Sequence, residues 1–143
     1  MAQGAGQGES AKTGGMPRIV HLDEMTLGGI DIPRPDLPHE WIAHDFTDAA
    51  DVVTRLAGAQ VAVINKVKLD AATLAALPDL KLIAVTATGT DVVDSAAAQA
   101  RGIQVRNVVG YAGTSVAEHV TMLIFALARG LVPFRDSVID GRW

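Results

Sequence analysis

The sequence contains no cysteine, which excludes disulfide bridges and zinc sites built on thiolates. Aromatic residues make up only 4% of the 143 residues, whereas hydrophobic residues of all kinds reach 49%. This aliphatic composition is typical of an α/β protein, and the length allows one domain with a substantial core. The histidines lack the spacing of metal ligands, so no metal site is predicted; they are His21, His39, His44 and His119.

Basic residues are in the minority: 12 Lys and Arg against 16 Asp and Glu give a net charge of −4. No basic stripe alternates with aromatic residues, so no nucleic-acid partner is expected. The longest apolar stretch, residues 116–128, is shorter than a membrane-spanning helix, so no membrane partner is expected. The N-terminal stretch has no apolar segment of the kind found in signal peptides. Together these absences predict a cytoplasmic protein.

The first fifteen residues consist mainly of Gly, Ala, Gln and Ser without periodicity, and residues 1–15 are expected to be a disordered leader. They would be a natural leader, a vector remnant or the product of a misplaced start, with Met16 as a candidate for the true start. The glycine-rich run at 4–8 follows no strand and lacks the G-x-G-x-x-G spacing. It is therefore not interpreted as a phosphate-binding loop.

Five short apolar runs, rich in β-branched residues, predict five strands. Helical patterns alternate with most of these runs, which predicts a mainly parallel, doubly wound α/β sheet. The segment 23–38, rich in Gly and Pro, is predicted to be a loop or a short irregular piece. The predicted strands are 18–22, 41–46, 60–65, 80–86 and 103–107.

Three helices are predicted between the later strands, and each opens on a residue suited to capping and closes before Gly or Pro. The first should place Val52, Val53 and Leu56 together on one apolar face. The predicted helices are 47–56, capped by Thr47, 70–77, capped by Asp70, and 91–101, capped by Asp91.

The turn after the fourth strand is the strongest candidate for a binding site. Residues 82–85 are apolar and suit a strand buried on both faces, and the pattern breaks at Thr88-Gly89-Thr90. A helix is predicted to begin directly afterwards, at Asp91. In a parallel sheet such a turn lies at the carboxyl end of its strand, where ligands bind. Exposed N–H groups beside a helix N-terminus favour a small anion.

A long apolar helix is predicted near the end of the chain. Ser115 and Glu118 have the spacing of a capping box, and the helix should run to about Arg129, with Gly130 as its end. A further helical piece is predicted at 134–140. Because the long helix is apolar nearly all round, it should pack against a second domain or subunit. The sequence also stops without a polar tail, so it looks cut short.

Several motifs, in one order along the chain, resemble those of the D-isomer-specific 2-hydroxyacid dehydrogenases, most closely the glycerate or hydroxypyruvate-type members. The last of them, 141–143, looks like the family's segment just before the nucleotide-binding strand. The similarity extends over roughly residues 16–143. The motifs are Asn65-Lys66, 80–83, 88–91 with Val93-Asp94, 101–105 with Asn107, 115–119 running on to Arg129, and 141–143.

The resemblance implies a two-domain oxidoreductase that is usually a homodimer. Residues 16–110 would form a flavodoxin-like substrate-binding domain with about five strands. Residues 111–143 would form interdomain and dimerisation helices leading into an NAD-binding Rossmann domain that is absent from this sequence. Hydride would move between NAD or NADP and the C2 carbon of a small 2-hydroxy or 2-keto acid.

The family likeness also implies roles for individual residues. The substrate carboxylate would lie against Thr88, Gly89 and Thr90, with Lys66 as a further substrate contact. The turn that carries Thr114, Ser115 and Val116 would lie beside the nicotinamide. The family's catalytic arginine, glutamate and histidine lie further along the chain than residue 143. No catalytic residue is therefore assigned here, and the polypeptide alone should not turn over.

His119 beside Glu118 is not interpreted as an acid–base pair, because adjacent helical residues point in different directions.

Two other functions are compatible with an isolated flavodoxin-like module. A phospho-receiver would use an acidic pair after the first strand, as Asp23-Glu24 could supply. It would also need an aspartate where the third strand ends, but Asn65-Lys66 stands there. A ligand sensor or corepressor built on the dehydrogenase scaffold would keep the anion-binding turn and lose the chemistry.

Overall fold

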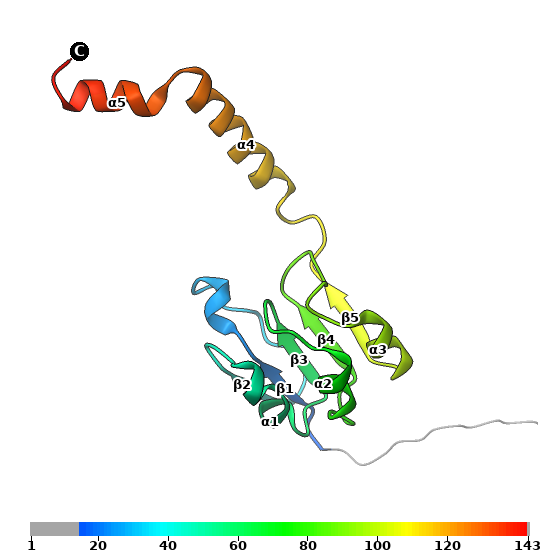
Figure 1. The fold of residues 1–143 in the computed structure, drawn as a ribbon. Coiled ribbons are helices and arrows are strands. Elements are labelled where there is room, and N and C mark those ends of the chain that lie inside the picture. Colours follow the sequence, from blue (N-terminus) through cyan, green and yellow to red (C-terminus); the bar gives the residue numbers. More distant parts are fainter. Residues whose placement is uncertain (1–14, 143) are drawn as a thin grey trace, which may run out of the picture. The chain divides into compact units, whose positions relative to one another are not determined.

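The computed structural model describes residues 15–142. The predicted leader therefore lies outside the described residues except for Gly15, and so does Trp143. The chain divides into two compact units, the first ending at Asn107 and the second beginning at Val108 (Figure 1). Each unit is described by itself.

The first unit is built on a five-stranded parallel sheet with the strand order β2-β1-β3-β4-β5. This confirms the predicted parallel α/β fold. Each strand has four residues and is shorter than predicted, and β2 begins one residue before its predicted start. The strands are β1 (Arg18–His21), β2 (Glu40–Ala43), β3 (Val61–Ile64), β4 (Leu82–Val85) and β5 (Gln104–Asn107).

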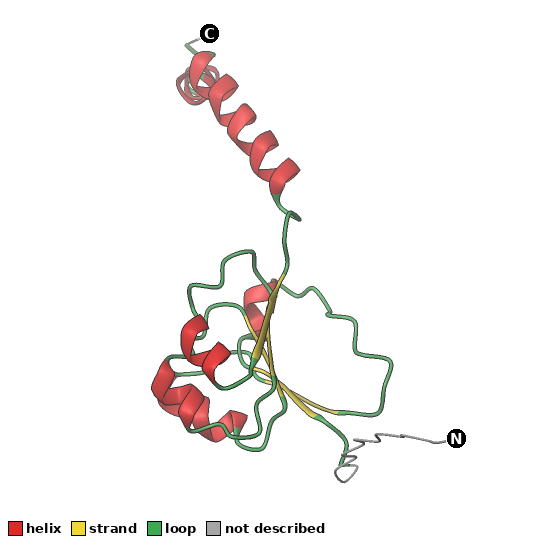
Figure 2. Ribbon diagram, turned by 90° about the vertical axis from the view of Figure 1, so that its right-hand side faces the viewer, coloured by secondary structure: helices red, strands yellow, loops and turns green. Residues whose placement is uncertain are grey.

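The helices of the first unit lie on one face of the sheet. The connections from β2 to β3, from β3 to β4 and from β4 to β5 all run in the same direction across the sheet. Because such crossovers are right-handed, the helices within them lie on one side of the sheet. Figure 2, with the sheet nearly edge-on, shows the helices gathered on that side. They are α1 (Val52–Leu56), preceded by the 3₁₀ turn η2 (Ala49–Asp51), then α2 (Ala71–Ala75) and α3 (Ser95–Ala100).

The hydrophobic core lies between these helices and the sheet. Each helix contributes at least one fully buried side chain, such as Leu56 of α1, Leu74 of α2 and Ala98 of α3. Burying one such leucine stabilises the fold by roughly 1.5–3 kcal/mol. The strands supply the other wall of the core with Val20, Ala62, Ile64, Ile83 and Val85.

The opposite face of the sheet carries the alternate residues of each strand. The register aligns Ile19 with Trp41, and His21 with Val63, so these side chains share that face. The long connection from β1 to β2 begins with the 3₁₀ helix η1 (Glu24–Leu27) and returns across this side. From it Arg34 places its guanidinium carbon 4.0 Å from the centre of the Trp41 ring.

The predicted start of the first helix is wrong. Thr47 does not cap a helix; its buried hydroxyl donates to the carbonyl of Leu22 and accepts from the Arg55 guanidinium at 2.7 Å. The hydroxyl is thus already occupied in joining the end of β1 to the segment after β2. The predicted apolar face is also only partly correct, because Val53 is 38% exposed.

The predicted start of the helix after β4 is wrong as well. Asp91 lies in a turn, and the helix begins at Ser95, with Asp94 as its N-cap accepting from the Ala97 N–H at 2.9 Å. Val93 pairs with Leu69 in an isolated parallel bridge. That extended pairing holds the backbone out of the helical conformation until Asp94. The predicted cap at Asp70 is confirmed, because its carboxylate accepts from the Thr73 N–H at 2.8 Å.

The second unit consists of two helices, α4 (Gly113–Ala128) and α5 (Leu131–Ile139), joined at Gly130. Gly130 has φ +58°, so the predicted end of the long helix is confirmed. The predicted capping box is wrong: the N-cap is Ala112, and no side chain caps the helix. Because α4 begins two residues before Ser115, that serine lies too far inside the helix to serve as its N-cap.

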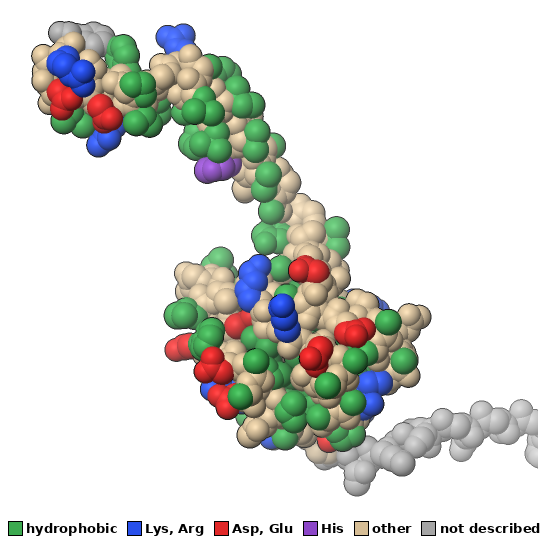
Figure 3. All heavy atoms as spheres, in the orientation of Figure 1, with side chains coloured by type: hydrophobic (Ala, Val, Ile, Leu, Met, Phe, Trp, Pro, Cys, Tyr) green, Lys and Arg blue, Asp and Glu red, His purple; other side chains and the backbone are tan. Residues whose placement is uncertain are grey.

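Apolar side chains of the second unit are exposed on every side of the helices. None of the described residues of α4 or α5 is buried, and Figure 3 shows hydrophobic side chains over much of this unit's visible face. Among the described residues, no single helix is both long and apolar enough to cross a membrane. Only α4 and α5 together, with a 58° bend between them, reach that length and composition.

Candidate functional site

The carboxyl edge of the sheet brings together the loops that follow β1, β3 and β4. The connections reverse direction at β1, since β2 lies on one side of it and β3 on the other. In open parallel sheets ligands bind at such a reversal, beyond the carboxyl ends of the strands. The loops that begin at Asp23, Asn65 and Thr86 therefore form the candidate site.

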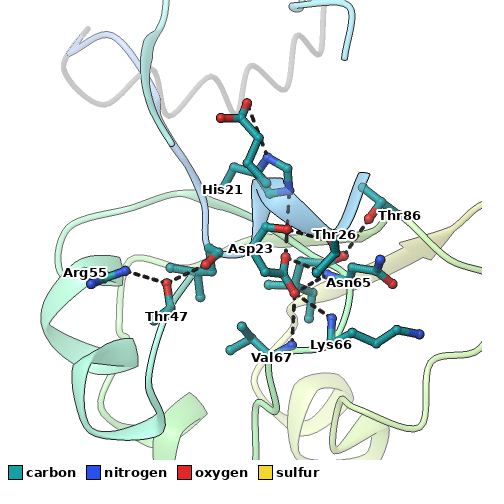
Figure 4. Close-up of polar contacts among 12 residues, drawn as sticks. His21, Asp23, Thr26, Thr47, Arg55, Asn65, Lys66, Val67 and Thr86 are labelled. Atoms are coloured by element: carbon teal, nitrogen blue, oxygen red, sulfur yellow. Dashed lines mark hydrogen bonds and ion pairs between the residues drawn. The ribbon is translucent and has the colours of Figure 1, made fainter. Parts of the chain in front are cut away.

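Asp23 occupies the centre of this edge, directly after β1 (Figure 4). Its buried carboxylate accepts hydrogen bonds from three successive backbone N–H groups of the loop after β3. The distances are 2.9 and 3.0 Å from Asn65, 2.6 Å from Lys66 and 3.1 Å from Val67. The side chain therefore ties the end of β1 to the end of β3, across more than 40 residues of sequence.

Lys66, predicted as a substrate contact, lies at this edge as expected. Only its backbone contacts Asp23; in Figure 4 its side chain extends away from that carboxylate. The side chain is exposed, and among the described residues its ammonium forms no ion pair. The ammonium is thus available to an anionic ligand at the edge of the sheet.

The predicted anion-binding turn, Thr88–Thr90, lies at the carboxyl end of β4, the strand next to β3. The Asn107 side chain donates to the Thr88 carbonyl at 2.6 Å and holds the turn against β5. The N–H groups of Gly89 and Thr90 donate no hydrogen bond within the described residues. They are therefore open to an acceptor from a ligand.

Gly89 does not have a positive φ, and the only atom that a side chain at this position would meet within 4 Å is an oxygen of the exposed Asp91 side chain. A Cβ atom at this position would come within 2.9 Å of the Asp91 carboxylate. That carboxylate lies beside the turn and opposes the binding of an anion electrostatically. Lys66, on the neighbouring loop, carries the opposite charge.

A small pocket of about 240 Å³ opens beside Asp23 and Lys66. Thr26 and Thr47 are also in its wall, and both hydroxyls are bonded to main-chain carbonyls, Thr26 to that of Asp23 at 2.6 Å. The remaining wall is largely apolar, with Phe46, Ala49, Val52 and Val67. A second lysine, Lys68, completes the lining.

His21 is fully buried just beneath this edge. Its ring nitrogens lie 3.8 Å from the Asp23 carboxylate and 3.9 Å from that of Glu24, too far for hydrogen bonds. Burial is the main cause that lowers the pKa of His21 below its ordinary 6.5, with Arg34 acting in the same direction and the two carboxylates against it. His21 is therefore neutral at neutral pH. The described residues hold no group of three or more His, Asp or Glu side chains arranged for a metal ion.

The residues predicted to contact a cofactor, Thr114, Ser115 and Val116, lie in the first turn of α4 in the second unit. All three are exposed, and the first turn has no side-chain cap. The structure thus brings Lys66 and Thr88–Thr90 together at one edge of the sheet. It places the three predicted cofactor contacts in a separate unit.

Asp23 is the residue of this site that the sequence did not reveal. From the sequence alone, a carboxylate after the first strand indicates only half of a receiver's acidic pair. The signal that points to its role is the pairing of β1 with β3, which brings Asp23 opposite Asn65.

Comparison with known proteins identifies the relatives of this chain. The family described as "D-isomer specific 2-hydroxyacid dehydrogenase, catalytic domain" matches residues 31–133. A glycerate dehydrogenase from Methylorubrum extorquens is 50% identical over 127 residues, covering 88% of this chain. A putative 2-hydroxyacid dehydrogenase from Haemophilus influenzae is 43% identical over 127 residues and also covers 88% of it.

A solved structure has a similar fold over the same part of the chain. It is an NADPH-dependent glyoxylate/hydroxypyruvate reductase from Sinorhizobium meliloti in complex with NADP and malonate. It is 26% identical, has a TM-score of 0.67, and the match covers 90% of this chain and 40% of that one. The chain likewise spans 40% of the length of the two curated relatives.

Proposed function

The chain belongs to the D-isomer specific 2-hydroxyacid dehydrogenase family, and on this premise we propose that it supplies the substrate-binding part of an NAD(P)-dependent oxidoreductase. The enzyme would act on the CH–OH group of a small D-2-hydroxy acid, in the class of glycerate and hydroxypyruvate. The similarity to a glycerate dehydrogenase at 50% identity supports this substrate class. We further propose that residues 16–110 form the substrate-binding domain and residues 111–143 the interdomain and dimerisation helices of a cytoplasmic homodimer.

One observation carries the proposal: the N–H groups of Gly89 and Thr90 are unbonded within the described residues and lie next to the loop of Lys66. A planar carboxylate accepts hydrogen bonds from such N–H groups, and the Lys66 ammonium attracts its negative charge, an attraction that a neutral substrate lacks. Thr88 shapes the same turn through its carbonyl. These residues would bind the substrate carboxylate and so orient the C2 carbon for reaction.

NAD or NADP would supply or accept the hydride. Thr114, Ser115 and Val116 are proposed as this chain's contacts with the cofactor, because the first turn of α4 has no side-chain cap. The N–H groups of Thr114 and Ser115 suit a polar ligand atom, whereas that of Val116 already donates to the Ala112 carbonyl at 2.9 Å. The Sinorhizobium meliloti relative contains NADP. These three residues would hold one side of the cofactor, and the catalytic groups would come from elsewhere in the enzyme.

The binding step can be tested on the 143-residue chain by titrating hydroxypyruvate and following backbone amides by NMR. We expect the Gly89, Thr90 and Lys66 amides to shift most. Dihydroxyacetone is the matched control, since it replaces the carboxylate by a neutral CH₂OH group, and it should leave those amides unchanged. Equal responses to both compounds would contradict an anion-binding turn.

Lys66→Ala tests the lysine in the same titration. We expect affinity for hydroxypyruvate to fall about tenfold, because a charge-assisted contact is lost. Lys81→Ala removes an equal charge just before β4, at the opposite edge of the sheet, and is expected to change affinity by less than about twofold, since exposed charges contribute little at a distance. Equal losses in the two variants would show a general charge effect and no specific contact.

Turnover can be tested in a chimera in which this chain replaces the matched 127-residue segment of the Methylorubrum extorquens glycerate dehydrogenase. NADH- or NADPH-dependent reduction of hydroxypyruvate is the expected result. Binding without turnover in a folded chimera would instead favour a ligand sensor on the dehydrogenase scaffold.

A further inference from the structure

The loop after β3 forms an anion-binding site that is already filled by the protein itself. Three consecutive N–H groups, from Asn65, Lys66 and Val67, converge on the Asp23 carboxylate at 2.6–3.1 Å. Such a run of N–H groups is a nest of the kind that binds phosphate or carboxylate ligands. It lies where the sheet connections reverse, which is the expected ligand position in this type of sheet.

Asp23 is held tightly enough to act as a permanent occupant. Its residue is only 3% exposed, and the carboxylate oxygens share four hydrogen bonds with the nest. Hydrogen bonds to a charged acceptor are stronger than those to a neutral one, and Asp23 is tethered to the chain, so a substrate carboxylate would not displace it. The next loop along the sheet, at Gly89 and Thr90, has unbonded N–H groups instead.

We propose that Asp23 is a positioning residue: its carboxylate closes the nest at 65–67 to substrate and fixes the backbone from which the Lys66 side chain extends. The role of Lys66 rests on the proposed function; the occupied nest does not. Of two neighbouring anion-binding loops, only the turn at 88–90 then remains open. A substrate with one carboxylate consequently binds in one orientation, with Lys66 held beside it.

Removing the carboxylate should turn the nest into a site for external anions. In Asp23→Ala the side chain ends at Cβ, which leaves the three N–H groups without an acceptor and makes room for formate. Formate is expected to shift the amides of Asn65 and Val67 in Asp23→Ala and to leave these two unchanged in the wild type. Failure of formate to shift these amides in folded Asp23→Ala would overturn the proposal. This measurement uses no substrate, so it stands apart from the proposed dehydrogenase function.

A second variant covers the case in which Asp23→Ala does not fold. Asp23→Asn keeps the shape of the side chain but presents an NH₂ group to a nest of donors, which disturbs the loop without opening a cavity. We expect affinity for hydroxypyruvate to fall about tenfold, as expected when a contacting group is displaced. Asp45→Asn removes an equal charge from the exposed loop after β2 and should leave the affinity unchanged.

The double variant shows whether Asp23 acts through Lys66. If it does, Asp23→Asn/Lys66→Met will bind hydroxypyruvate no more weakly than Lys66→Met alone, because the positioned group is already missing. Losses that multiply in the double variant would show that Asp23 supports the fold in general, and the proposal would be wrong. If the wild type does not bind hydroxypyruvate at all, the proposed function fails while the formate result remains decisive for the nest.

Discussion

At the scale of single residues, the burial of His21 has the clearest physical consequence. The imidazole is fully buried and faces Asp23, Glu24 and Arg34, and it meets the ring of Trp41 edge-on at 6.3 Å. Neither ring nitrogen has a hydrogen-bond partner within the described residues. Charging the ring inside the protein is therefore unfavourable even with two carboxylates nearby.

We predict that the lowered pKa of His21 makes the fold less stable in mild acid. The unfolded chain binds a proton near the ordinary pKa of 6.5, whereas the folded chain binds it only at lower pH. The stability that neutral His21 contributes to the folded state is therefore fully present above pH 6.5. It is lost as the pH falls from 6.5 through the pKa of His21 in the folded protein. Urea unfolding at about pH 7.5 and about pH 5 measures this loss.

His21→Gln, which cannot be protonated, should show a smaller drop in the free energy of unfolding between the two pH values than the wild type. His44 has its pKa lowered by the same main cause, burial, so part of the drop will remain. His39→Gln, at the more exposed edge beside Trp41, is the matched control. An unchanged drop in His21→Gln would assign the acid sensitivity to other groups.

At the scale of elements, local sequence patterns predicted which segments form strands and helices, but not where helices begin. The β-branched runs are specific because such side chains suit a pleated strand with at least one face against the core. Capping residues specify a helix start less precisely, since several residues able to serve as the N-cap lie near each start. Contacts from distant parts of the chain set two of the helix starts. Val93 pairs with Leu69, which delays the helix expected at Asp91, and the Thr47 hydroxyl is bonded to the Leu22 carbonyl. Ser115 is not an N-cap because α4 already begins at Gly113.

The same reasoning explains what was missed at the candidate site. The turn at Thr88–Thr90 has a local signature, a Gly between a buried strand and a helical pattern, and it was predicted. Asp23 has none, because its partners lie 42–44 residues away. Only the order of strands in the sheet reveals that pairing.

The helix start after β4 yields a prediction with an internal control. Asp94→Ala should lower the free energy of unfolding by about 1 kcal/mol, because it removes the acceptor of the Ala97 N–H at the N-cap. Asp91→Ala removes an acidic residue three positions earlier that does not cap the helix, and it should cost less than about 0.5 kcal/mol. Urea denaturation compares the two, and an equal or larger loss in Asp91→Ala would contradict the observed N-cap.

At the scale of the whole molecule, the chain is two units joined by a short loop after β5. The first has a core enclosed by helices and sheet, whereas no described residue of α4 or α5 in the second is buried. Most of the fold's stability therefore resides in the first unit. The second would gain stability from a partner surface, in keeping with the proposed interdomain and dimer contacts.

Brief treatment with chymotrypsin should separate the units. Tyr111 lies in the joining loop and is 63% exposed, so we expect early cleavage after it, whereas Trp41 is in a strand and should resist. Mass spectrometry identifies the product that ends at Tyr111. In urea this product should unfold in one cooperative transition, monitored by circular dichroism. A fragment that loses its cooperative transition would show that the first unit depends on α4 and α5.

The strand order has a consequence for synthesis on the ribosome. β1 emerges first, but its two neighbours in the sheet, β2 and β3, follow about 20 and 40 residues later. At roughly 5–20 residues per second, β1 remains without its second neighbour for a few seconds. Asp23 meets the N–H groups of Asn65, Lys66 and Val67 only when β3 has left the ribosome and paired, so until then the buried carboxylate of the folded protein remains without these three donors.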